Sequence, residues 1–424
     1  MMKRVWILML LLLLSGCQIG NEKLNQQDQK IEEKLQESEL DLKDEREDQS
    51  DNKAVSEASS EASILEASVD QIVSSLSLEA KVAQLFYVTL EDYQRTGLPY
   101  GGIIFFKHNM ITADQTQNTI SKIQSELTVP AFIGLDEEGG LVTRITGKAS
   151  IGGTEIPEAW VLGHAAIPNA VYIANEIIAR EIRILGFNMN FAPVGDIHTN
   201  PQNPIIGHRA FSDNPEVVAE KVIEAIRAYQ NHNIIPVIKH YPGHGDTKED
   251  SHMGTATLNH DLSRLMTIEL VPFIEAIRGG VDVIMVGHLQ VPQITGDLTP
   301  ASLSEVMIQE ILIDELGFDG LIVSDALNMK SIVDEYSTEA MINKGLDAGL
   351  NLFLMPENVD EAYKYLLEKA QTSKETEMKI DNTLRKIIRL KLEKNLFEHK
   401  NQVLQDPTIG RLEDRKMMTD LLNE

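Results

Sequence analysis

The chain has 424 residues, 42% of them hydrophobic, so it is long enough for two average domains or for one α/β barrel of about 250 residues or more. Acidic residues outnumber basic ones by 65 to 38, which gives a formal net charge of −27. Because such a charge repels the phosphates of nucleic acids, we expect no nucleic-acid partner.

The N-terminal residues resemble a bacterial lipoprotein signal. Lys3 and Arg4 precede an apolar run at residues 5–14, which is shorter than the roughly 20 residues needed to cross a bilayer. Two small residues then precede Cys17, the only cysteine of the chain. We predict that residues 1–16 are a signal peptide and that a lipid on Cys17 anchors the protein to the membrane. The alternative is an uncleaved N-terminal anchor, and both interpretations place the folded part outside the cytoplasm.

Residues 17–72 are rich in Glu, Asp, Lys, Gln and Ser and contain no aromatic residue. A segment with so few large apolar side chains and so much charge cannot bury a core. We therefore predict a disordered acidic tether at 17–72, a folded domain at 73–400 and a C-terminal tail at 401–424.

From residue 77 onward, short apolar runs alternate with helical patterns. The runs are rich in Val, Ile and Phe without polar alternation, as expected for parallel strands that are buried on both faces. They lie at 84–88, 102–106, 131–135, 188–193, 236–239, 283–286, 320–323 and 352–355. Helical patterns between them include 170–185, 215–231, 262–278 and 303–316. This order predicts a single α/β domain, a (β/α)8 or TIM barrel.

Polar residues follow several of the predicted strands. They are Asp136, Asp196, the pair Lys239 and His240, His288, and Asp325. In a barrel of this kind the catalytic groups lie at the C-terminal ends of the strands, so these side chains are expected to meet there. Polar residues also end the strands of doubly wound sheets, so the pattern favours the barrel without excluding that fold.

The segment from Lys239 to His252, KHYPGHGDTKEDSH, carries an unusual number of ionisable residues for a loop. A purely structural loop is one interpretation. A zinc site is a second, with His240, His244, Asp250 and His252 as ligands, although the spacing matches no known zinc signature. A proton-transfer loop is the third, because Asp250 could fix the tautomer of His252 and raise its basicity.

Two further motifs carry carboxylates and arginines. Asp325 follows the apolar run at 320–323 and is a candidate nucleophile, although it could also be the N-cap of a helix near Asn328. Asp136 begins the run DEEGG, and Arg144 follows it; carboxylates and arginines of this kind bind sugar hydroxyls, but an acidic turn has the same pattern. Arg209, in GHRAFS, could equally be a salt-bridged surface residue.

Taken together, the motifs KHYPGHGDTKEDSH, LDEEGGLVTR, NFAPVGDI, GHRAFSDNP and IVSDALNM resemble glycoside hydrolase family 3, in its β-N-acetylglucosaminidase branch. The resemblance extends from about residue 76 to 396. It implies a (β/α)8 barrel and a retaining two-step mechanism, in which Asp325 attacks the anomeric carbon and Asp250 with His252 forms the acid/base dyad. It also implies that a set of five residues binds the hydroxyls of N-acetylglucosamine: Asp136, Arg144, Arg209, Lys239 and His240. No cofactor or metal is implied.

The branch implies that the proton donor comes from a barrel loop. Family members that act on β-glucosides generally take it from a second domain, whereas here only a short helical pattern follows residue 356. Asn351 and Ala326 depart from the acidic residues frequent in the family, which leaves the surroundings of Asp325 open.

We expect a monomeric, membrane-anchored enzyme that removes terminal β-linked N-acetylglucosamine from peptidoglycan fragments or muropeptides. A β-glucosidase or β-xylosidase of the same fold, and a sugar-binding lipoprotein without activity, are the alternatives.

Overall fold

The computed structural model describes residues 62–248, 254, 256–398 and 408–422. The predicted signal peptide, the lipidation site Cys17, and the pair Asp250 and His252 lie outside the described residues. None of the described helices is both long enough and apolar enough to cross a membrane.

Eight parallel strands form the centre of the fold, in the order β10-β1-β2-β3-β4-β5-β7-β9. The ends of this order also meet, because Leu352 N donates to Ile322 O and Ser324 N donates to Leu352 O, both at 3.1 Å. The predicted (β/α)8 barrel is thus confirmed. The strands are β1 (Phe86–Thr89), β2 (Gly102–Ile104), β3 (Phe132–Leu135), β4 (Met189–Asn190), β5 (Ile235–Tyr241), β7 (Val283–Val286), β9 (Leu321–Ser324) and β10 (Phe353–Leu354).

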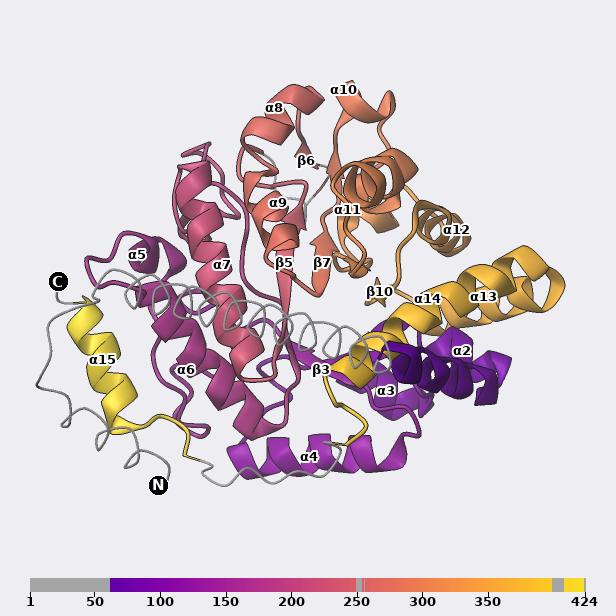
Figure 1. Ribbon diagram of the computed structural model, residues 1–424, viewed down its shortest axis with the longest axis horizontal. Helices are drawn as coiled ribbons and strands as arrows, with labels where there is room; N and C mark the ends of the chain where they lie inside the picture. Colours follow the sequence, from indigo (N-terminus) through magenta and orange to yellow (C-terminus); the bar gives the residue numbers. More distant parts are fainter. Residues whose placement is uncertain (1–61, 249–253, 255, 399–407, 423–424) are drawn as a thin grey trace, which may run out of the picture. The chain divides into compact units, whose positions relative to one another are not determined.

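Helices surround the strands (Figure 1). The predicted helices at 170–185 and 215–231 match α6 (Ala170–Leu185) and α7 (Pro215–Asn231) at both ends. Their ends follow local rules: Asn214 accepts a hydrogen bond from Val217 N at the start of α7, and Gly186 ends α6 with φ 101°. The other helices that cover the barrel are α2 (Leu78–Ala83), α3 (Leu90–Thr96), α4 (Ala113–Glu126), α5 (Ala159–Gly163), α12 (Thr338–Ala348), α13 (Val359–Thr372) and α14 (Lys374–Glu393).

Two predicted helices differ from the structure. The pattern at 262–278 forms two helices, α8 (Leu262–Thr267) and α9 (Val271–Arg278), because Pro272 cannot continue a helix and instead lies in the first turn of α9. The pattern at 303–316 begins with a 3-10 turn, η2 (Ala301–Leu303), and continues as a π-helix, η3 (Val306–Glu315). Other short elements of this half are β6 (Ala256–Thr257), β8 (Leu289–Gln290), α10 (Pro292–Thr295) and α11 (Lys330–Val333).

The folded part extends beyond the predicted limits of 73–400. Residues 62–75 are helical, and Val69 and Val73 are buried. At the other end, α15 (Leu412–Leu422) packs on α6 and buries Met418 and Leu421. A few apolar residues spaced along a charged segment thus suffice to attach each of these helices to the core.

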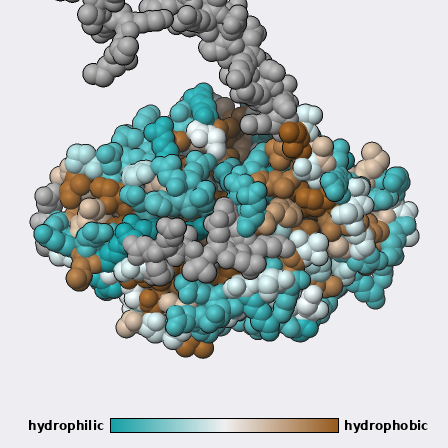
Figure 2. Space-filling view, turned by 60° about the horizontal axis from the view of Figure 1, so that its bottom comes forward, coloured by the Kyte–Doolittle hydropathy of each residue, from teal (hydrophilic) through white to brown (hydrophobic). Residues whose placement is uncertain are grey.

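Two apolar layers hold the barrel together. One lies inside the strands and includes Tyr87, Phe132 and Phe191, while the larger one lies between strands and helices. Leu390 of α14 joins the inner layer, so this helix closes one end of the barrel. The outer surface is mainly polar, and Figure 2 shows apolar residues in separate small areas of the face that it displays. The other end of the barrel, where the strands terminate, carries the polar residues.

Candidate active site

The turn after β3 brings two carboxylates to the C-terminal end of the barrel. Asp136 follows the strand directly, and Glu138 is two residues further. Gly139 and Gly140 then turn the chain sharply, with φ 87° and 54°. A Cβ atom on Gly140 would lie 2.6 Å from Cγ of Glu158, so a larger residue does not fit this turn.

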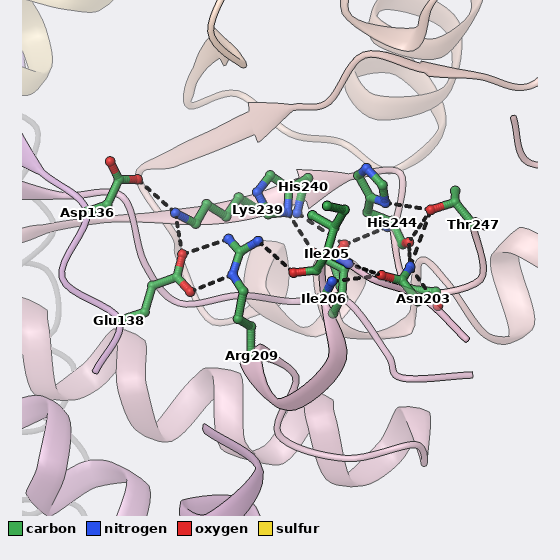
Figure 3. A network of polar contacts seen from close by, with 12 residues as sticks. Asp136, Glu138, Asn203, Ile205, Ile206, Arg209, Lys239, His240, His244 and Thr247 are labelled. Carbon is green, nitrogen blue, oxygen red and sulfur yellow. Dashed lines mark hydrogen bonds and ion pairs between the residues drawn. The ribbon is translucent and has the colours of Figure 1, made fainter. Parts of the chain in front are cut away.

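Three cations meet these two carboxylates, and Figure 3 shows two of them, Lys239 and Arg209. The Nζ atom of Lys239 lies 2.9 Å from Asp136 Oδ1 and 2.7 Å from Glu138 Oε1. Arg209 binds Glu138 with two parallel hydrogen bonds, from Nε at 2.9 Å and from Nη2 at 2.8 Å. Arg144 Nη2 donates to Asp136 Oδ2 at 3.1 Å. Four of the five predicted sugar-binding residues therefore lie in one network, and Glu138 joins Arg209 to it through Lys239.

The charges of this network stabilise one another. Burial alone would raise the pKa of Glu138, but Arg209 and Lys239 hold it below its usual value. Burial alone would lower the pKa of Lys239, yet Glu138 and Asp136 raise it. Glu138 and Lys239 therefore stay ionised near neutral pH, and they offer a charged acceptor and a charged donor to a ligand with hydroxyl groups.

The fifth predicted residue, His240, is held by Asp196. The Nδ1 atom of His240 lies 2.6 Å from Asp196 Oδ2, and the backbone N of His244 donates to Asp196 Oδ1 at 2.6 Å. Burial would raise the pKa of the fully buried Asp196, but the two histidines lower it. An ionised Asp196 keeps the proton of His240 on Nδ1 and leaves Nε2 to face a ligand.

The loop after β5 is packed against the loop after β4 as far as residue 248. Thr247 Oγ1 contacts His244 Nδ1 at 2.7 Å, and Asn203 Nδ2 donates to His244 O at 2.8 Å. A Cβ atom on Gly245 would lie 1.6 Å from Ile197 O, so only glycine allows this approach of two backbones. The first part of the predicted proton-transfer loop is therefore fixed by its neighbours.

Asp325 lies at the end of β9, on the same side of the barrel. Its backbone N donates to Val286 O at 2.9 Å, and Ala326 N donates to Asp325 Oδ1 at 2.7 Å. The helix that follows, α11, starts after Met329, so the interpretation of Asp325 as an N-cap is wrong. Burial lowers the pKa of His244, and the charge of Asp325 is among those that oppose this effect. Asp325 is thus electrostatically coupled to the loop after β5.

His288 supports the turn at Asp325, whereas Asn351 does not. His288 is buried, with Nδ1 at 2.7 Å from Ser302 Oγ and Nε2 at 3.0 Å from Ala326 O. Asn351, one of the departures from the family pattern, precedes β10 and accepts a hydrogen bond from Ile322 N at 2.8 Å, so it contacts the start of β9 rather than the site. Among the described residues, no group of three or more His, Cys, Asp or Glu side chains is arranged to hold a metal.

Sequence reasoning did not assign roles to Glu138 and Asp196. Both hold other site residues by hydrogen bonds, and both are almost fully enclosed. Glu138 stands in the run DEEGG, and Asp196 ends the motif NFAPVGD, so their positions after strands were the available signal. Their partners, however, lie far away in the sequence.

Known proteins share this sequence pattern. Residues 77–390 match the model described as the glycosyl hydrolase family 3 N-terminal domain. A Stenotrophomonas maltophilia protein named beta-hexosaminidase is 35% identical over 269 residues, which are 62% of this chain and 78% of that protein. A Pseudoalteromonas piscicida protein named beta-hexosaminidase A is 29% identical over 354 residues. That match covers 76% of this chain and 58% of the Pseudoalteromonas protein.

A solved structure shares the fold. It is a glycoside hydrolase family 3 beta-N-acetylglucosaminidase from Paenibacillus sp. str. FPU-7, with a TM-score of 0.76 and 34% identity over 82% of this chain and 68% of that chain. The family match at 77–390 spans the barrel and all the described polar residues discussed above. The chain therefore belongs to glycoside hydrolase family 3.

Proposed function

We propose that the protein is a retaining exo-β-N-acetylglucosaminidase. The observation that carries this proposal is the ion-pair network of Asp136, Glu138, Arg144, Lys239 and Arg209 at the end of the barrel where Asp325 also lies. The network suits a ligand rich in hydroxyl groups. The names of the relatives, beta-hexosaminidase and beta-N-acetylglucosaminidase, support the choice of sugar.

In the proposed mechanism, the network and His240 bind the hydroxyls of the terminal sugar. A carboxylate oxygen of Asp325 then forms a bond to the anomeric carbon while the bond from this carbon to the leaving oxygen breaks. The leaving oxygen takes a proton from His252, which Asp250 orients. In the second step His252 removes a proton from water, and the oxygen of this water displaces Asp325 from the sugar.

We also propose that the substrate is a peptidoglycan fragment and that the enzyme acts as a monomer outside the cytoplasm. The signal pattern and Cys17 support this location, since a lipid on Cys17 would hold the enzyme near the cell wall. In a Cys17→Ser variant, the protein should leave the membrane fraction and keep its activity. Membrane association that is equal in both proteins would overturn the anchor.

The first experiment compares 4-nitrophenyl β-glycosides of N-acetylglucosamine, glucose and xylose as substrates. We expect the highest kcat/KM for the N-acetylated sugar, and we expect Asp325→Ala to abolish turnover together with covalent trapping of a 2-fluoro sugar. A higher kcat/KM for the glucoside or the xyloside would show that the enzyme is a β-glucosidase or a β-xylosidase instead. Binding without turnover in the native protein would indicate a sugar-binding lipoprotein, and full activity of Asp325→Ala would refute its role as nucleophile.

The dyad is tested through the leaving group. General acid catalysis contributes a factor of about a hundred to ten thousand, and only poor leaving groups need it. His252→Ala should therefore slow hydrolysis of a disaccharide far more than hydrolysis of the activated 4-nitrophenyl substrate. Equal losses for both substrates would indicate that His252 binds the sugar instead.

A further inference from the structure

Glu137 stands between the two carboxylates of the network but faces the other way. Its exposed fraction is 0%, whereas the Asp136 side chain is 19% exposed. The backbone N of Glu137 donates to Asn190 Oδ1 at 2.9 Å, which ties it to β4. A fully buried carboxylate requires hydrogen-bond donors, and here all of them come from one short segment.

Four donors from residues 143–146 surround the Glu137 carboxylate. Thr143 Oγ1 and Thr146 Oγ1 donate to Oε1 at 2.5 and 2.6 Å. The backbone N atoms of Arg144 and Ile145 donate to Oε2 at 2.5 and 2.9 Å. Burial raises the pKa of Glu137, and the hydrogen bonds of these donors oppose that rise. Each carboxylate oxygen thus accepts two hydrogen bonds from the turn that carries Arg144.

The side chain of Arg144 leaves this turn toward the proposed sugar site. Its Nη2 atom binds Asp136 at 3.1 Å, and its Cζ atom lies 5.7 Å from the centre of the Phe106 ring. Its Nε atom is buried and has no hydrogen-bond partner among the described residues. Of the five N–H donors of this guanidinium, two are used, by Asp136 Oδ2 and by Thr143 O, so others remain for a ligand provided that the backbone of the turn keeps its position.

We propose that Glu137 is a positioning residue that fixes the backbone of the 143–146 turn and so holds Arg144 in place to bind the sugar. This inference rests on the proposed function of the site. Leu141, just before the turn, is 83% exposed, whereas Ile145 within it is 1% exposed, so Glu137 and Ile145 attach this turn to the interior. Substrate-positioning groups lose their effect when displaced by about 1 Å, so an anchor of this kind acts on binding and catalysis.

A double-mutant cycle separates positioning from simple stabilisation. Glu137→Met removes all four acceptor interactions, and we expect KM to rise and kcat/KM to fall about 10- to 100-fold. If Glu137 acts through Arg144, the same change made in an Arg144→Ala background should cost little further activity. Glu137→Gln should restore most of the loss, because its oxygen can accept from the two backbone N–H groups while its amide donates to the threonine hydroxyls.

Glu181 offers a matched control. It is also a buried carboxylate, 2% exposed, and accepts hydrogen bonds from Thr154 Oγ1 at 2.7 Å, Thr154 N at 3.0 Å and Gly410 N at 2.8 Å. Glu181→Met should lower the melting temperature and leave KM unchanged. If Glu137→Met does not fold, Thr146→Val, which removes one donor, takes its place in the cycle.

The outcomes distinguish this inference from the proposed function. The proposed function fails if the native protein hydrolyses no N-acetylglucosaminide, and the cycle is then measured with whichever glycoside it does hydrolyse. Additive losses from the Glu137 and Arg144 changes, or a lowered melting temperature with unchanged KM, would overturn the positioning role while leaving the function intact.

Discussion

Two buried lysines lie at opposite ends of the barrel and differ in what surrounds them. Lys239 lies in β5 near its C-terminal end, its side chain is 3% exposed, and it contacts the carboxylates of Asp136 and Glu138. Lys391 of α14 is 0% exposed and lies where the strands begin. Its amine donates to Gln84 Oε1 at 2.8 Å and to Gly101 O at 3.0 Å, and it lies 4.7 Å from the centre of the Phe132 ring.

The difference separates an electrostatic role from a structural one. Burial lowers the pKa of both amines, but two carboxylates reverse the effect at Lys239. Within the described part of the chain, Lys391 donates only to neutral oxygens, and its pKa falls well below its usual value. A buried charge that is paired with opposite charges can bind a ligand without destabilising the folded state. A buried charge that contacts neutral groups alone destabilises the folded state. The C-terminal end of the barrel thus presents paired charges, whereas α14 closes the opposite end.

The largest expected effect is on Lys239. In Lys239→Met, Asp136 loses one of its two cations and Glu138 keeps only Arg209. Because a buried hydrogen bond to a charged group contributes about 1.5–3 kcal/mol, and partners left unpaired add to the loss, we expect kcat/KM to fall roughly a hundredfold or more. The measurement is hydrolysis of the preferred 4-nitrophenyl glycoside. Activity within about threefold of the native protein would contradict an electrostatic binding role.

A smaller effect is expected for Arg209→Lys, which keeps the charge and removes the paired hydrogen bonds to Glu138. Lysine cannot form this fork, so Glu138 would move and disturb Lys239. We expect KM to rise about tenfold with a modest change in kcat. An unchanged KM would mean that charge alone, without the geometry of the fork, organises this end of the barrel.

The sequence predicted the barrel and the residue types of the site, because both depend on local patterns. Apolar runs without alternation predicted the eight strands, and polar residues near the ends of those strands predicted that Asp136, Lys239 and Asp325 would lie at one end of the barrel. The break between α8 and α9 could also have been predicted from the sequence, since Pro272 marks it. The amphipathic pattern continues across the break, however, and so predicted one helix.

The connections between site residues could not be predicted, because they depend on approaches between distant segments. Glu138 meets Arg209 across 71 residues, and Asp196 meets His240 across 44. In the run DEEGG, three adjacent carboxylates look alike in sequence, yet Asp136 and Glu138 face the cations while Glu137 faces the turn at 143–146. Only the three-dimensional path of the turn after β3 assigns these different roles.

The smallest expected effect concerns Lys391 and is seen in stability rather than activity. Its pKa in the folded protein lies below 10.5, the value expected in the unfolded chain, so the unfolded state binds more protons between these two values. Stability therefore rises with pH over this window and reaches its full value above 10.5, with a slope of at most about 1.4 kcal/mol per pH unit. Lys391→Met lacks this slope.

Urea unfolding of the native protein, Lys391→Met and Lys239→Met between pH 7 and pH 10 tests the contrast between the two ends. The native protein should gain stability relative to Lys391→Met as pH rises. The pKa of Lys239 is raised instead, so its contribution is fully present below 10.5 and is lost only as pH rises above that value. The difference between the native protein and Lys239→Met should therefore stay constant over the same range. Parallel curves for all three proteins would mean that Lys391 carries its charge as readily as Lys239, and that the neutral oxygens around it are as effective as carboxylates.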